Sequence, residues 1–99
     1  SHGTGVLKEL PIKEIDFDEL WQKSDKEIKK FINSLDMQTL LASLNDMGED
    51  VEERVKSLLN NENKKKFIEF KDNVRKVSKQ KINASKKMIS DLWNQIDKS

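Results

Sequence analysis

The sequence predicts an all-α protein, a three- or four-helix bundle with a long C-terminal helix. Apolar residues recur at spacings of three and four over most of the chain, which is the period of an amphipathic helix. One Pro, three Gly and no Tyr among 99 residues leave little material for the turns and strands of a β protein. Charged residues make up 37% and apolar residues 34%, a balance that suits a narrow core surrounded by solvated helix faces.

The first fifteen residues are expected to lie outside the bundle. Residues 1–5 have the small, polar composition of a remnant left by an expression vector, and we exclude them from the fold. Residues 6–15 carry several apolar side chains, but the segment is short and interrupted by Pro11, so we expect an N-terminal arm lying against the bundle. Residues 16–99 are expected to form a single domain, because no linker, repeat or low-complexity tract divides them.

The first helix is predicted over residues 16–34. Asp16 stands three residues before Glu19, which is the spacing of a capping box, and apolar residues follow in helical phase. Ser24 and Glu27 repeat the capping-box spacing inside the segment. Because the apolar phase runs through this second pair unbroken, one helix over the whole segment is favoured.

The second helical segment covers residues 36–59. Asp36 can cap its start, and the apolar residues keep helical phase up to its end. Two alternatives stay open at Gly48. Either the segment is one helix of about 24 residues, or Gly48 ends a short helix and the acidic residues that follow it begin another, since acids are favoured in a first helical turn.

The last helix is predicted over residues 62–97, where no Gly or Pro occurs. As one straight helix it would measure roughly 54 Å, against roughly 30 and 35 Å for the two preceding segments, so its end would overhang them. The overhang carries five apolar residues in helical phase: Met88, Ile89, Leu92, Trp93 and Ile96.

Three arrangements would cover this apolar overhang. The helix bends near residues 83–85 and the five residues become intramolecular core, covered by the N-terminal arm or the first helix; or they pair with a second copy of the chain; or they dock a partner protein. The intramolecular arrangement is favoured, because a lone Trp at helical spacing is more often core than interface.

The net charge of +1 conceals a separation of charge along the chain. Residues 64–87 hold ten Lys or Arg against two acids, whereas residues 6–63 are acidic. At 100° per residue, six of these bases fall on one flank of the predicted last helix: Lys65, Arg75, Lys76, Lys79, Lys86 and Lys87. This basic flank would attract nucleic acid, an anionic lipid surface or an acidic protein partner. The favoured interpretation is balance with the acidic helices, because the flank is poor in Arg and has no interleaved aromatic residues.

Residue patterns for catalysis, metal binding or cofactor binding are absent from the sequence. It has no Cys, and its one His lies within residues 1–5, so the usual general bases and thiolate nucleophiles are missing. The acidic cluster at residues 49–53 lacks the Asp-x-Asp-x-Asp-Gly pattern of a calcium loop and stands where the acids of a helix N-terminus are expected. We therefore expect no enzyme activity, no cofactor and no metal site.

The sequence thus predicts a non-catalytic helical module for protein interaction or structure, with a protein partner or a second copy as its ligand. The second hypothesis is binding of nucleic acid or anionic lipid through the basic flank. No segment is apolar enough to span a membrane. In its Lys- and Asn-rich composition the chain resembles short helical domains of secreted or surface proteins from organisms with AT-rich genomes. No motif accompanies this resemblance, so it carries over no functional residue and no compartment.

Overall fold

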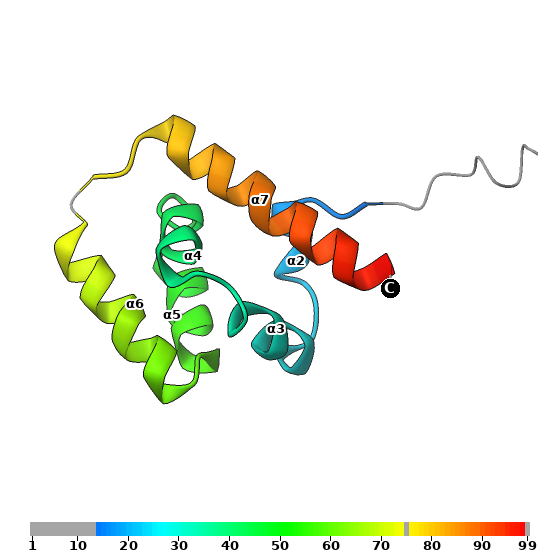
Figure 1. The fold of residues 1–99 in the computed structure, drawn as a ribbon, viewed down its shortest axis with the longest axis horizontal. Coiled ribbons are helices and arrows are strands. Elements are labelled where there is room, and N and C mark those ends of the chain that lie inside the picture. Colours follow the sequence, from blue (N-terminus) through cyan, green and yellow to red (C-terminus); the bar gives the residue numbers. More distant parts are fainter. Residues whose placement is uncertain (1–13, 75, 99) are drawn as a thin grey trace, which may run out of the picture.

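The computed structural model describes residues 14–74 and 76–98, and the regular elements of this part are all helices. The six helices, labelled as in Figure 1, are α2 (Phe17–Leu20), α3 (Asp25–Ile32), α4 (Met37–Ser43), α5 (Glu49–Leu58), α6 (Asn61–Asn73) and α7 (Lys79–Lys98). The predicted all-α class and the long C-terminal helix are confirmed. Residues 1–5 and most of the predicted N-terminal arm, up to Lys13, lie outside the described residues.

The prediction of one helix over residues 16–34 is wrong, because both capping boxes form. The Asp16 carboxylate accepts a hydrogen bond from the Glu19 amide at 3.0 Å and begins α2, and the Ser24 hydroxyl accepts one from the Glu27 amide at 3.3 Å and begins α3. The break frees backbone carbonyls that would otherwise bond within a helix. Arg54 of α5 donates to two of them, at residues 21 and 23.

The second segment is divided into two helices, as one of the two alternatives expected, but α4 ends at Ser43 and not at Gly48. Gly48 instead caps the start of α5. It precedes the first residue of α5 with a φ of 92°, in the left-handed region that glycine adopts without steric cost. The acids Glu49, Asp50 and Glu52 occupy the first turn of α5, where the helix dipole favours negative charge.

The predicted last helix is broken at residues 74–78, and the expected bend near residues 83–85 is wrong. α6 ends at Asn73, Val74 is extended, and α7 starts at Lys79 with the Ser78 hydroxyl accepting from the Lys81 amide at 3.2 Å. Without Gly or Pro in this stretch, the capping Ser78 is the one local signal of a new helix. α7 then runs back across α4 and α2 (Figure 1), so the overhang expected of a straight helix does not arise.

The core lies between α7 and the shorter helices. α7 packs chiefly on α4 and α2, α6 packs on α4, and α5 packs on α3 and α6. The fully buried side chains come from every helix: Leu20, Ile28, Ile32, Leu40, Ser43, Leu44, Val55, Phe67 and Ile89. Such burial of large apolar side chains, each contributing about 1.5–3 kcal/mol, is what stabilises helices as short as α2 and α4.

Candidate protein-docking site

α7 carries two apolar stripes side by side. The core stripe, Ile82, Ile89 and Trp93, is buried against the other helices, with exposed fractions of 7% or less. The exposed stripe, Met88, Leu92 and Ile96, has one residue in every fourth position and retains 53%, 37% and 56% of its accessible surface. Residues four apart lie on one helix face, so the exposed stripe is a continuous apolar row.

Aromatic packing holds the core stripe in place. The ring of Trp93 meets the ring of Phe31 from α3 edge to face, with centroids 5.2 Å apart and an interplanar angle of 83°. The indole N–H of Trp93 is buried and has no acceptor within the described residues, so ring packing rather than a hydrogen bond fixes this side chain. For Ile89 and Trp93 the structure thus has the intramolecular arrangement that was favoured, whereas Met88, Leu92 and Ile96 stay outside.

Asn94 anchors the C-terminal half of α7 to the start of the described chain. Its side chain accepts from the Ile15 amide at 3.1 Å and donates to the Ile15 carbonyl at 2.9 Å, across 79 residues of sequence. A further bond joins it to the Ser90 carbonyl within α7. Sequence reasoning missed this residue. An Asn in the middle of a helix is unfavourable unless its amide has a partner, and that was the available signal.

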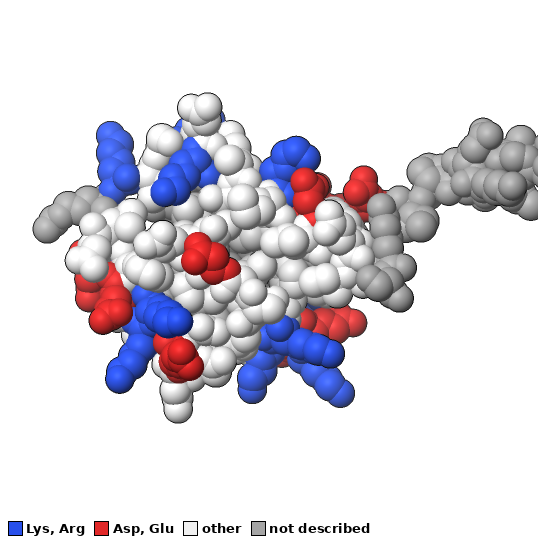
Figure 2. Space-filling view, viewed as in Figure 1, with Lys and Arg blue, Asp and Glu red and all other residues white. Residues whose placement is uncertain are grey.

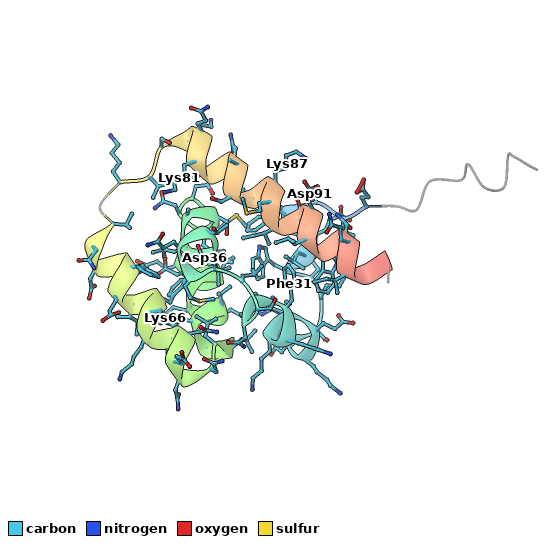
Figure 3. The ribbon with its side chains drawn as sticks, in the orientation of Figure 1. Phe31, Asp36, Lys66, Lys81, Lys87 and Asp91 are labelled. Carbon is cyan, nitrogen blue, oxygen red and sulfur yellow. The ribbon has the colours of Figure 1, made fainter. Side chains whose placement is uncertain are left out.

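A groove of about 450 Å³ lies between α3 and the last turns of α7. It is lined by Glu27, Lys30, Phe31, Ser34, Trp93 and Ile96. Phe31 points from α3 toward α7 (Figure 3). Ile96 belongs both to the groove and to the exposed stripe, so that the two form one apolar surface. The charged groups Glu27 and Lys30 stand only on the α3 side of the groove, within the described residues.

The structure does not place the predicted basic flank on one helix. Lys65 is on α6, Lys76 is in the connecting segment, and Lys79, Lys86 and Lys87 are on α7; Arg75 lies outside the described residues.

Two of the α7 lysines of this flank are engaged within the molecule. Lys86 pairs with Asp46 at 2.7 Å and lies 5.6 Å from the ring centroid of Phe17. Lys87 pairs with Asp91 at 3.1 Å, on the side of α7 away from α3 (Figure 3). These pairs agree with the interpretation that the bases balance neighbouring acids.

A second group of bases surrounds α3, and sequence reasoning missed it. We call it the α3 lysine cluster: Lys23, Lys26, Lys29 and Lys30. None of the four has an ion pair within the part of the chain that the structure describes, and Figure 2 shows basic side chains, Lys or Arg, gathered over α3. In the sequence the cluster is hidden, because Asp25 and Glu27 are interleaved with it and keep the local net charge small.

The acids next to α3 are already engaged. Asp25 pairs with Arg54 at 2.8 Å. Glu27 accepts a hydrogen bond from the Ser24 amide at 3.3 Å as the second half of its capping box. The hydrogen bond from the Ser24 amide leaves the negative charge of Glu27 in place, whereas the charge of Asp25 is balanced by Arg54. The four lysines of the α3 lysine cluster therefore outnumber the one acid of α3 that has no ion pair in the described part of the chain, and the α3 side of the groove has a net positive charge.

The acidic cluster of α5 surrounds a lysine of the same molecule. Lys71 of α6 pairs with Glu52, and the pKa of Lys71 is raised by its hydrogen bond to Glu52 and by the nearby Glu49 and Glu53. A hydrogen bond from Lys56 in turn lowers the pKa of Glu53. No group of three or more His, Cys, Asp or Glu side chains is placed to hold a metal ion in residues 14–74 and 76–96.

No protein-family model matches the chain, and no curated protein or solved structure is significantly similar to it. Among the helices that the structure describes, none combines the length and the hydropathy required to cross a bilayer.

Proposed function

We propose that the chain is a non-catalytic interaction module that docks an amphipathic helix of a partner protein. The observation that carries the proposal is the continuous apolar surface formed by the exposed stripe and the groove, on a helix anchored at Asn94. Contiguous exposed apolar surface marks interaction sites in soluble proteins. A groove beside an apolar helix row suits a helical ligand, whose anchors recur at every third or fourth position.

A catalytic role finds little support among the groups that line this surface. Glu27 is the one carboxylate of the groove, and it is used by the capping box of α3. No His or Cys occurs among the described residues, so a proton shuttle or an activated nucleophile would need other groups.

Nucleic acid or lipid binding through the predicted basic flank is the weaker alternative. Its lysines are divided between α6, the connecting segment and α7, and Lys86 and Lys87 are paired with acids of the same molecule. A row of phosphates needs bases that are both aligned and free.

The proposal is tested with a displayed pool of helical peptides of about 16 residues, each with apolar anchors at helical spacing and random residues elsewhere. We expect the protein to enrich binders from this pool. The affinity of an enriched peptide is then measured by fluorescence anisotropy. The double substitution Leu92→Glu and Ile96→Glu should weaken binding at least about tenfold, because it places two carboxylates on the apolar surface.

Ile68→Glu is the matched control, since Ile68 is also an exposed apolar residue, 43% accessible, but belongs to α6. This variant should bind the enriched peptide as the parent does. Circular dichroism of each variant checks that the helices are retained. A pool without enrichment, or peptides that bind the double variant as tightly as the parent, would overturn the proposed docking function.

A further inference from the structure

We infer that the helix docked in the groove is acidic on one side, where its carboxylates meet the α3 lysine cluster. This inference rests on the proposed docking function and adds the chemistry of the partner. The juxtaposition that carries it is an apolar floor, Phe31 and Trp93, beside Lys30, which lines the groove together with Glu27. The lysines of the α3 lysine cluster have no ion pair within the described residues and outnumber this one carboxylate.

Lys30 lies on the α3 rim of the groove, and Lys26 precedes it by one turn of α3. They are four residues apart, so their side chains leave α3 on the same face, and Lys30 itself lines the groove. Both residues are exposed. A helical ligand with carboxylates four residues apart would place one near each ammonium group, since its own spacing matches that of α3.

The opposite rim of the groove has a different chemistry. Ile96 lines it, and Leu92 and Met88 continue it along α7 as an apolar row. Asp91, which directly precedes Leu92 in the sequence, is paired with Lys87 on the far side of α7. The α3 rim therefore has a net positive charge, with Glu27 as the one carboxylate that lines the groove, and the other rim is apolar. This asymmetry would fix which way round an amphipathic helix lies.

Neither a second copy of the chain nor a lipid surface supplies the same complement. The exposed stripe of another α7 is bordered by Lys81, and among the α7 side chains that the structure describes the one carboxylate, Asp91, is already paired with Lys87. A planar bilayer reaches the protruding Ile96 but not the groove floor, where Phe31 and Trp93 are 5% and 7% exposed.

The test uses three versions of one peptide enriched from the pool, which differ only in two flank positions four residues apart. These positions are both Glu, both Gln or both Lys. We expect the Glu version to bind tightest and the Lys version weakest, with about a tenfold difference in dissociation constant at low salt. The difference should shrink at physiological salt, because exposed ion pairs are screened.

Lys30→Glu should reverse this order of affinities, since it replaces attraction by repulsion at the rim. Lys65→Glu is the matched control: Lys65 is an exposed lysine of α6 without an ion pair in the described part of the chain. It should leave the order unchanged. Because both lysines are exposed, circular dichroism should find both variants folded.

Each contrary outcome has a distinct meaning. Equal affinity of the three peptides would overturn the acidic partner and leave helix docking intact. Absence of binding by any peptide, including the parent sequence, would overturn the docking function itself. Phosphatidylserine-containing vesicles that bind through Lys30 in place of the peptides would identify a lipid ligand instead. A dimer in sedimentation equilibrium that Leu92→Glu dissociates would identify a second copy.

Discussion

The core stripe and the exposed stripe of α7 are made of similar side chains on adjacent faces of one helix, yet one is covered and the other is not. Ile89 is fully buried, and Met88 next to it is 53% exposed. Together the two stripes span about 140° of the helix circumference at 100° per residue. The covering helices bury only the part of this arc that faces them. An apolar arc that is wider than the helices covering it leaves apolar surface exposed, and in α7 this surface is the candidate docking site.

The largest expected effect is on the core stripe. Trp93→Ala should lower the free energy of unfolding by about 3–5 kcal/mol, because it leaves a cavity against Phe31, whereas Leu92→Ala should lower it by less than about 1 kcal/mol. Urea denaturation followed by circular dichroism measures both. If Trp93→Ala fails to fold, Ile89→Val, with an expected loss of about 0.5–1.5 kcal/mol, replaces it. Equal losses in the free energy of unfolding for Leu92→Ala and for the core-stripe variant would contradict the division of α7 into a buried and an exposed stripe.

A smaller effect is expected at the anchor of α7. Asn94→Ala should cost about 1–3 kcal/mol, since it leaves the amide and the carbonyl of Ile15 without their partners. Hydrogen exchange of the Ile15 amide should speed up in this variant. Asn83→Ala, an exposed Asn of the same helix, should change the free energy of unfolding by less than about 0.5 kcal/mol. An Ile15 amide that exchanges at its original rate would refute the anchoring role.

Lys86 borders the core stripe on the side of α2 and should contribute less to the free energy of unfolding than Asn94 does. Lys86→Met removes the pair with Asp46 and the contact with the Phe17 ring, and should cost about 0.5–1 kcal/mol. The loss should diminish at high salt, because Asp46 is half exposed. Thermal unfolding at two salt concentrations measures it, and a loss that is independent of salt would assign the role of Lys86 to packing alone.

The smallest effect is expected on the exposed stripe itself. Leu92→Ser together with Ile96→Ser should alter the free energy of unfolding by less than about 1 kcal/mol, since neither side chain is buried in the described structure. Denaturation curves of the double variant and the parent should nearly coincide. A loss above about 2 kcal/mol would mean that the stripe is covered within the molecule, and it would remove the surface on which docking depends.

The sequence predicted the helical class and the apolar residues of α7, because both follow from local periodicity. It also contained the two capping boxes that begin α2 and α3, but the unbroken apolar phase outweighed the second. The reason why the box prevails is non-local: Arg54, about 30 residues away, binds the carbonyls that the break exposes. Because Arg54 lies outside residues 16–34, the sequence pattern of that segment does not indicate this interaction.

The candidate site was predictable only in part for the same reason. The five apolar residues from Met88 to Ile96 were identified together, and their division into two stripes depends on where α3 and α4 lie. Phe31 and the α3 lysine cluster were not identified as site residues, because only the fold brings α3 beside the end of α7. The expected alignment of the basic flank along one helix was wrong, since the break at residues 74–78 separates bases that an uninterrupted helix would align.

Nuclear magnetic resonance with labelled methyl groups tests most directly whether the exposed stripe is the docking surface. Addition of an enriched peptide should shift the methyl signals of Met88, Leu92 and Ile96 and the indole signal of Trp93, while those of Ile68 on α6 stay in place. Shifts confined to Ile68 and its neighbours, or no shift along α7 at saturating peptide, would contradict a docking role for this helix.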